Sequence, residues 1–400
     1  MTSAAERPRD LAFARPSDLP FAAVSFAYFA YAGLFGTYAP LWFQSLGYTT
    51  LAIGVLTSMQ SSTRLFSPYA WGWVADHTGR RERLLILAVA GALVASIGFF
   101  VAGPYAWVAA VTTLLFVCTA GVIPISESLL AYRVSSGGKL DIARYGRVRM
   151  WGSIGFVAAV SASGFALQAA GVGRFPWFAS GLLALLLVAA WRLPEVREPV
   201  HAEVVTTGAL AVLRQPVVAW FFAGVFLTVL AHTSLYAFYS LYLSSLGYDK
   251  GAIGLLWTVG VVVELLWFYF QGRWTHRLSM HAWLLVAALV SVLRFAAIAA
   301  FGASVAVLVA AQMLHAFTFA AQHSACVAVI SRHFPGRLRG RGQALYAILG
   351  YGASGVVGGV AGGALSEALG FAAVFWAASL AALGAAACCG LAMRAARAAS

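Results

Sequence analysis

The feature that most constrains this chain is a series of apolar segments, each long enough to cross a lipid bilayer as a helix. A membrane-spanning helix needs about 20 mostly apolar residues, and twelve segments meet that requirement. Hydrophobic residues make up 62% of the 400 residues and charged residues 10%, whereas a soluble domain is roughly half apolar and about a quarter charged. The sequence therefore predicts an all-α integral membrane protein and excludes a soluble enzyme or a disulfide-stapled secreted domain. The predicted spans are 21–45, 51–75, 84–102, 105–132, 150–170, 175–193, 216–243, 251–271, 282–302, 304–331, 343–366 and 371–391.

The positive charges predict how these spans are oriented. With twelve spans, 22 of the 26 Lys and Arg residues lie in segments on one side of the membrane. The other side carries Arg174 and Lys250, and the remaining two arginines fall inside spans. Basic loops stay on the cytoplasmic side. We therefore expect a multi-pass protein of the bacterial inner membrane with both termini in the cytoplasm.

The sequence contains no motif that supports several other functions. A net charge of +13 would suggest nucleic-acid binding in a soluble protein, but no basic stretch is long enough to form a docking face. The cysteines lack the spacing of a zinc site, and no metalloprotease, P-loop or nucleophile-elbow motif stands in a supporting context. We expect no enzyme activity, no cofactor, no metal and no nucleic-acid partner.

The chain repeats itself at an offset of 200 residues. Leu41 to Leu56 reads LWFQSLGYTTLAIGVL, and Leu241 to Leu256 reads LYLSSLGYDKGAIGLL. Two six-helix halves in the same orientation are parallel repeats, an arrangement that transporters use for alternating access around a central binding site. The predicted organisation is a cytoplasmic tail 1–20, a six-helix bundle 21–193, a cytoplasmic linker 194–215, a second bundle 216–391 and a cytoplasmic tail 392–400.

The segment between the second and third spans carries a specific motif. Gly72 is followed by Asp76, Gly79, Arg80 and Arg81. This pattern resembles the signature loop of the major facilitator superfamily. We expect Gly72 to permit close approach of a neighbouring helix, Gly79 to form a tight turn, and Asp76 to pair with a helix N-terminus or an arginine. Such contacts can latch one conformation.

The resemblance extends over nearly the whole chain. The segments 145–155, 231–236, 260–264 and 314–319 resemble the phenylpropionate permease family, a relative of the lactose permease within the superfamily. The resemblance implies the major facilitator fold, with twelve helices in two six-helix bundles, and a monomer. The loop of the second half, 272–277, is a degenerate copy of the motif, so the latch is expected mainly in the first half.

The resemblance also suggests what is moved. It implies a symporter that uses protons to import a small organic anion, for example an aromatic monocarboxylate such as a phenylpropionate. The partners would be the small-molecule substrate, protons and the bilayer. A neutral sugar or a nucleoside is the alternative substrate, since related branches carry these. A membrane sensor that transports nothing is the alternative from another class.

Four charged residues lie inside predicted spans, where ionisable groups are costly unless paired or hydrated. They are Arg64, Glu127, Glu264 and Arg294. Arg64 is a candidate anchor for an anionic substrate group, or the partner of Glu127. Arg294 is likewise a candidate anchor for the substrate, or the partner of Glu264. A guanidinium suits a carboxylate because it donates two parallel hydrogen bonds.

Glu264 is the first candidate for the coupling proton, because burial and nearby cations shift a carboxyl pKa in opposite directions. His315 is the second, since imidazole titrates near neutral pH, and His323 joins it. Each has a structural alternative, a permanent pair for Glu264 and a hydrogen-bonded core residue for the histidines. The lactose permease has a carboxyl one turn after its histidine, where this chain has Thr318 and Phe319, so its proton pathway is not expected in the same form.

Helical spacing adds aromatic candidates for the substrate site. His232 and Tyr236 share a face of the seventh span, and Phe319 shares a face with His315 in the tenth. These rings can stack on an aromatic substrate, or they pack against other helices. Separately, Gly355, Gly359 and Gly363 form a small-residue seam that predicts close helix packing.

Overall fold

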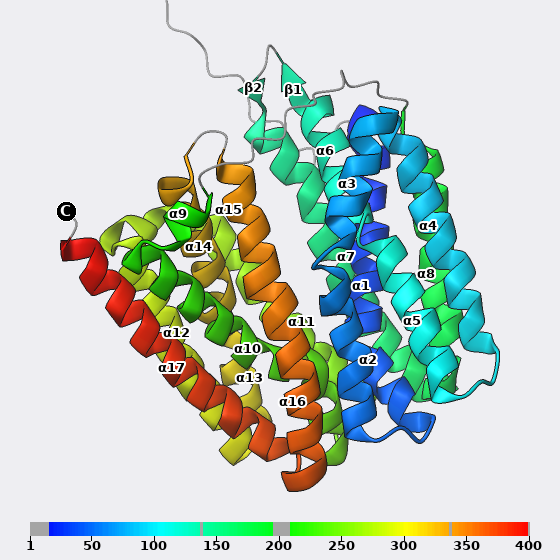
Figure 1. The fold of residues 1–400 in the computed structure, drawn as a ribbon. Helices are drawn as coiled ribbons and strands as arrows, with labels where there is room; N and C mark the ends of the chain where they lie inside the picture. The colour runs from blue at the N-terminus through cyan, green and yellow to red at the C-terminus, as the bar shows by residue number, and fades with distance from the viewer. Residues whose placement is uncertain (1–15, 137–138, 195–208, 336–337, 399–400) are drawn as a thin grey trace, which may run out of the picture.

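The computed structural model describes residues 16–136, 139–194, 209–335 and 338–398, and it is helical apart from one short strand pair (Figure 1). Most of the predicted N-terminal tail and linker, and the last two residues, lie outside these ranges. In the first half the helices are α1 Leu19–Ser45, α2 Thr50–Thr63, α3 Ser67–Thr78, α4 Arg81–Ile97, α5 Tyr105–Thr119, α6 Val122–Val134, α7 Ile142–Ala170 and α8 Phe175–Trp191. The strands β1 Ser135–Ser136 and β2 Lys139–Leu140 pair antiparallel between α6 and α7.

The second half continues the same pattern. Its helices are α9 Ala209–Leu213, α10 Pro216–Ser245, α11 Lys250–Phe270, α12 Met280–Phe301, α13 Val305–Met313, α14 Gln322–His333, α15 Arg339–Leu345, α16 Ser354–Leu369 and α17 Phe371–Ala398. Two π-helical turns, Ala316–Ala321 and Tyr346–Ala353, connect α13 to α14 and α15 to α16. In Figure 1 the helices before residue 194 stand on the right and those after residue 209 on the left.

Within the described residues, 11 helical stretches are long and apolar enough to cross a membrane. The predicted span 51–75 is not among them, because it is divided into α2 with 14 residues and α3 with 12. The break falls between Thr63 and Ser67, and Pro68 explains it. Proline has no N–H to donate to the carbonyl of Arg64, four residues earlier, and its ring clashes with that carbonyl in a helix. The proline is a visible sequence signal, and a prediction from apolar length alone does not use it.

Two helices extend beyond the predicted spans. α7 begins at Ile142 rather than at 150, because the Asp141 side chain accepts a hydrogen bond from the Arg144 backbone N–H at 2.9 Å and caps the helix. The predicted loop 133–149 is therefore largely helical. At the other end, α17 continues to Ala398, so most of the predicted tail 392–400 is helical as well.

The sequence repeat is also a repeat of backbone conformation. Gly47 and Gly247 both adopt positive φ, 83° and 87°. The side chains of Thr49 and Asp249 then accept hydrogen bonds from the backbone N–H groups three residues later, which begins α2 and α11 in the same way. The two halves thus turn identically at the end of their first helix.

The two halves meet through glycines near these turns. On one side of the interface α16 packs on α2: a Cβ at Gly359 would lie 2.7 Å from the carbonyl oxygen of Gly54, and one at Gly363 would lie 2.9 Å from the Leu51 Cα. Gly355 contacts Ser61. The predicted glycine seam is confirmed, and it joins the two halves.

The other side of the interface is built from α7 and α11. A Cβ at Gly254 would lie 2.7 Å from the carbonyl oxygen of Val160. The Tyr38 hydroxyl donates to that same carbonyl at 2.8 Å and lies 3.1 Å from the carbonyl oxygen of Lys250. These contacts lie toward the end that carries the turns at 46–49 and 246–249, and the ribbons diverge toward the opposite end, where β1, β2 and the C-terminus lie (Figure 1).

Candidate functional site

Arg294 in α12 is completely buried and forms the centre of a polar network. Its guanidinium donates hydrogen bonds to Gln312 Oε1 at 2.8 Å, to Thr318 Oγ1 at 2.8 Å and to His315 Nδ1 at 2.9 Å. The partners come from α13 and the π-helical turn after it, where the changed helical pitch brings His315 and Thr318 to the same side. Of the expected alternatives for Arg294, an ion pair with Glu264 is not observed among the described residues.

His315 connects Arg294 to Glu264 of α11. The His315 Nε2 atom lies 3.7 Å from Glu264 Oε2. A guanidinium can only donate, so Nδ1 of His315 accepts from Arg294 and the ring proton of the neutral imidazole stands on Nε2, toward Glu264. A second proton on Nδ1 would break the bond to Arg294. The observed bond to Arg294 therefore requires a neutral His315 ring.

The predicted aromatic candidates surround this network. His232 of α10 has its ring centroid 6.2 Å from that of His315, and its Nδ1 bonds the Thr228 carbonyl at 2.9 Å. Tyr236, one turn later, is 38% exposed and stacks on Trp257 at 6.3 Å. Phe319 stacks on His315 at 5.1 Å with an interplanar angle of 9°. The structure brings these residues together as expected.

His323 stands one turn beyond Phe319 in the chain. Its ring stacks on Phe319 at 6.1 Å, and its Nδ1 lies 3.2 Å from the hydroxyl of Tyr346. That hydroxyl is 3.3 Å from the hydroxyl of Tyr351 in the second π-helical turn. His323 therefore belongs to a separate group with Tyr346 and Tyr351, and an aromatic ring stands between it and His315.

In the first half, Glu127 of α6 pairs with Arg149 of α7, from Nε to Oε1 at 2.9 Å. The alternative that Glu127 pairs with Arg64 is therefore wrong in this conformation. Both members of the observed pair are about one-third exposed, and the Arg149 guanidinium also lies 4.3 Å from the centre of the Phe29 ring.

Arg64 is exposed at the break between α2 and α3 and makes no ion pair within the described part of the chain. It lies within electrostatic range of Tyr236 and Tyr351 of the second half. Arg149 is likewise within range of Glu264. Charged groups of both halves thus face a common region.

Sequence reasoning misses several of these groups. It places Arg149 in a loop, and it does not single out Gln312, Trp257 or Tyr351. Arg149 lies only one residue before its predicted span, so a less strict boundary would include it among the intramembrane charges. The others are uncharged and do not stand out in an apolar helix.

The predicted latch residues form the turn between α3 and α4. Gly79 has φ 63° and ends α3 in the left-handed conformation, as expected. A Cβ placed on Gly72 would meet no atom within 4 Å, so the expected close approach of a helix is wrong in this conformation. Arg81 donates to Ser128 Oγ of α6, and Arg80 is exposed beside it. The Asp76 side chain lies outside what the structure describes.

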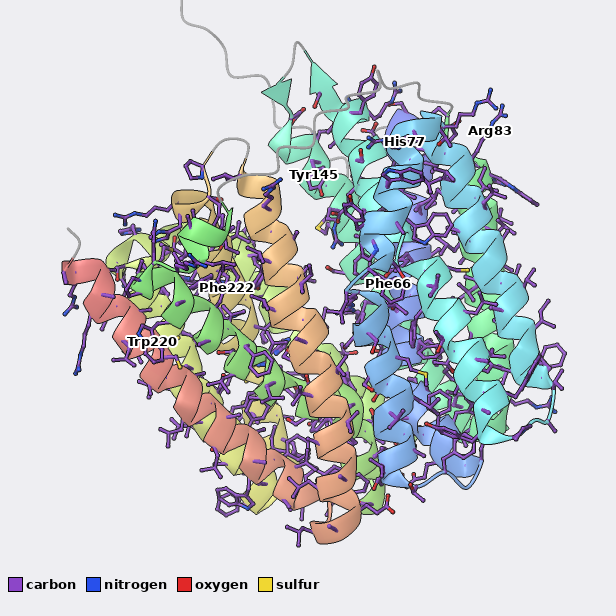
Figure 2. All side chains as sticks on the ribbon, in the orientation of Figure 1. Phe66, His77, Arg83, Tyr145, Trp220 and Phe222 are labelled. Atoms are coloured by element: carbon purple, nitrogen blue, oxygen red, sulfur yellow. The ribbon has the colours of Figure 1, made fainter. Side chains whose placement is uncertain are left out.

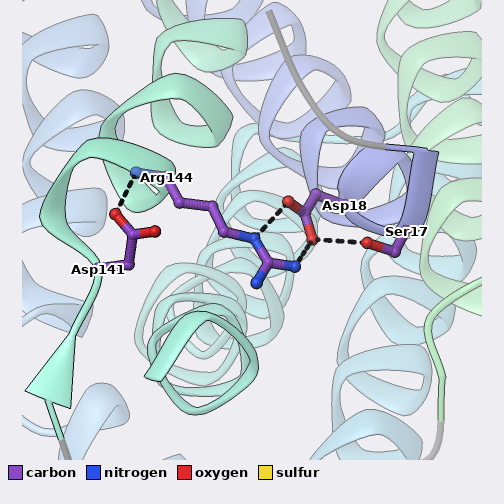
Figure 3. A network of polar contacts seen from close by, with 4 residues as sticks. All are labelled: Ser17, Asp18, Asp141 and Arg144. Carbon is purple, nitrogen blue, oxygen red and sulfur yellow. Dashed lines mark hydrogen bonds and ion pairs between the residues drawn. The ribbon is translucent and has the colours of Figure 1, made fainter. Parts of the chain in front are cut away.

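Figure 2 shows His77, Arg83 and Tyr145 at this same end of the molecule, away from the contacts between the halves, with Phe66 at the helix break. A polar network at this end joins α1 to α7 (Figure 3). Asp18, whose side chain is 1% exposed, accepts from Arg144 Nε at 2.7 Å and Nη2 at 2.5 Å. This guanidinium holds the pKa of Asp18 below its ordinary value.

The helical architecture, the repeat and the buried polar network define the class of this protein as a multi-pass membrane transporter of the major facilitator superfamily. The family model described as the MFS_1 like family matches residues 19–377, and the chain belongs to that family. The resemblance seen in the sequence motifs is thereby confirmed.

The chain is similar to individual proteins of known name. A "Probable 3-phenylpropionic acid transporter" of Escherichia coli strain K12 is 30% identical over 371 residues, which cover 90% of this chain and 93% of that protein. "Maltose permease" of Geobacillus stearothermophilus is 30% identical over 280 residues, 68% of each chain. The fold is similar to the crystal structure of the nucleoside transporter NupG, with a TM-score of 0.79, 16% identity, and coverage of 95% of this chain and 99% of that one.

Proposed function

We propose that this protein is a proton-coupled symporter that imports a small organic anion, for example an aromatic monocarboxylate such as a phenylpropionate. The observation that carries the proposal is the pairing of cationic and aromatic groups at one region between the halves. Arg64 is exposed there without an ion pair in the described part of the chain, and Tyr236 stacks on Trp257 beside the Arg294 network. A carboxylate binds to guanidinium, and an aromatic ring packs on aromatic walls.

In this proposal Arg64 binds the substrate carboxylate, and Arg294 holds the site together. Arg294 is fully buried and donates to three acceptors through its two terminal nitrogens, so a substrate would have to enter this buried network to reach the remaining Nε–H. Arg64 is exposed and makes no ion pair within the described part of the chain. Tyr236 and Phe319 then contact the aromatic ring, and Glu127, paired with Arg149, adjusts the charge near Arg64.

The proton is assigned to Glu264. When Glu264 is protonated, one of its oxygens can accept a hydrogen bond from the Nε2–H of His315 and the other can donate one. When it is ionised, its charge attracts Arg149 and competes with an anionic substrate for nearby cations. Binding of the proton and of the substrate anion therefore favour each other, which is the linkage that symport requires. His323 with Tyr346 is proposed as a further proton-carrying group on the side away from the contacts.

The conformation described is proposed to be the inward-open one. The basic loops predicted to be cytoplasmic lie at the end where the halves diverge, and the glycine contacts close the other end. Transport then requires the α2–α16 and α7–α11 contacts to separate while the latch around Gly79, Arg80 and Arg81 changes partners.

A neutral sugar or nucleoside is the second candidate, favoured by the identity to the maltose permease. Thermal unfolding of the purified protein with 3-phenylpropionate, its neutral amide, maltose and a nucleoside distinguishes these, since a ligand that binds the folded state raises Tm. The proposal expects stabilisation by the acid, little by the amide, and uptake of the acid into liposomes when the external pH is lowered. Stabilisation by maltose or the nucleoside alone would overturn it. Binding of the acid without any uptake would favour a sensor.

A further inference from the structure

A second apolar feature lies apart from the candidate site. It is a groove of about 630 Å³ between α11, the loop that follows it, the start of α12 and the first π-helical turn. Phe317 lines the groove and stands two residues after His315, so it points to the opposite side of its helix. The groove therefore lies behind the site rather than opening into it. Its volume is within the range of pockets that bind small molecules.

The inner wall of the groove is aromatic. The ring of Trp267 lies 5.6 Å from Trp274, 5.4 Å from Trp283 and 5.2 Å from Phe317. The rim is open, because Leu266 is 51% exposed. In a membrane protein, an exposed apolar rim faces the acyl chains of the bilayer. Tryptophan is enriched at the level of the lipid headgroups.

The end of the groove is positively charged. Arg277 lines it, and the guanidinium of Arg273 lies 4.7 Å from the centre of the ring of Phe270, another lining residue. Both arginines are exposed. They belong to the end of the molecule that carries most of the basic residues, and basic pockets between membrane helices on that side bind anionic lipid headgroups.

The wall also contains hydrogen-bond donors without acceptors. The indole nitrogens of Trp267 and Trp274 are buried and have no partner within the described part of the chain. Phosphate and ester oxygens of a lipid are acceptors of the kind that these two N–H groups lack. An apolar occupant without oxygen atoms would leave both donors unsatisfied, which is unfavourable.

We propose that this groove binds one anionic phospholipid, with an acyl chain against Trp267 and Phe317 and the phosphate on Arg273 and Arg277. The loop concerned, 271–279, is the second-half counterpart of the latch loop. At the 200-residue offset Asp76 corresponds to His276, and His77 corresponds to Arg277. Trp73 likewise corresponds to Arg273, whereas Arg80 and Arg81 correspond to Met280 and His281. The loop 271–279 therefore has no acidic residue, and its two arginines stand at the groove.

The test uses the full-length protein reconstituted in phosphatidylcholine vesicles that contain a small fraction of lipid with brominated acyl chains. Bromine quenches tryptophan fluorescence on contact, so quenching reports lipid at the groove. Brominated phosphatidylglycerol is expected to quench several-fold more strongly, at equal mole fraction, than brominated phosphatidylcholine. The W267F variant is expected to lose much of this difference.

In the double variant R273Q/R277Q, the two brominated lipids should quench the tryptophan fluorescence equally. Its matched control is R192Q/R394Q, which removes two exposed arginines from the ends of α8 and α17 at the same face, and which should keep the preference. Equal quenching by the two lipids in the unmodified protein would overturn the proposal. An unchanged preference in R273Q/R277Q would overturn it as well.

Discussion

At the scale of single residues, the two arginines predicted to lie within the membrane have different surroundings, and we propose different roles for them. Arg294 is fully buried and donates to Gln312, His315 and Thr318, whereas Arg64 is exposed and has no ion pair among the described residues. In the proposed function Arg294 is therefore the structural centre, and Arg64 is the cation that binds the substrate. These assignments lead to separable experiments.

Replacing Arg64 by Gln is expected to weaken binding of an aromatic carboxylate by about tenfold or more, since a hydrogen bond to a charged group contributes about 1.5–3 kcal/mol. Affinity for the neutral amide should change little, and Tm should stay near that of the unmodified protein. Isothermal titration with both ligands measures this. Equal losses for acid and amide would show that Arg64 does not bind the carboxylate.

Replacing Arg294 by Gln should instead lower Tm, because three buried acceptors lose their donor. The same measurements distinguish the two arginines, because the R294Q variant is expected to have a lower Tm and to bind both the acid and the amide poorly. An R294Q protein of unchanged Tm that fails only with the acid would reverse the roles of the two residues.

The Asp18–Arg144 pair predicts a pH dependence. The pKa of Asp18 is lowered in the folded state by its hydrogen bonds from Arg144, so the pair contributes stability above the ordinary pKa of aspartate and loses it as pH falls through the lowered value. The D18N variant should therefore have a lower Tm than the unmodified protein at neutral pH, and the difference should shrink in acid. The D141N variant is the control, because Asn also caps a helix. A pH-independent difference would contradict this account.

At the scale of the elements, apolar length alone predicts most helices but not the breaks within them. Apolar runs of about 20 residues determine that a segment spans the membrane, and the glycine seam of α16 is recognisable from its spacing. The division of α2 from α3 depends on Pro68 and the carbonyl of Arg64, a local clash that mean hydropathy does not detect. The π-helical turn carrying Thr318 has no sequence signature of its own.

The same limit applies to the candidate site. Glu264, His315 and Arg294 stand out in the sequence because charged groups are costly in a bilayer. Which groups pair does not follow from the sequence: Glu127 pairs with Arg149, which lies one residue outside its predicted span, and not with Arg64. Pairing depends on how the helices pack, which apolar composition leaves open.

The packing of α16 on α2 gives a prediction for the conformational change. A side chain at Gly359 would collide with the Gly54 carbonyl and with Ser58, so the G359V variant should lose the closed contact. Spin labels on residues 44 and 244, in a background without the four native cysteines, should then show a longer distance population. The G390V variant is the control, since a Cβ there meets nothing within 4 Å. Unchanged distances in G359V would remove this contact from the gate.

At the scale of the whole molecule, the account depends on orientation in the membrane. The distribution of basic residues predicts that the turn at Asp249 lies outside the cell and the end of α17 inside. In the same cysteine-free background, D249C should react with a membrane-impermeant maleimide in intact cells, and R394C only after permeabilisation. The opposite labelling pattern would make the described conformation outward-open.

The central claim is that Glu264 couples the proton to the substrate. The most direct measurement compares two forms of transport of 3-phenylpropionate in liposomes containing the E264Q variant. One is accumulation driven by a pH gradient, and the other is exchange of labelled for unlabelled substrate without a gradient. The account predicts that accumulation is abolished while exchange remains measurable, because the neutral amide leaves the site intact but carries no proton. Accumulation at the rate of the unmodified protein would contradict the claim.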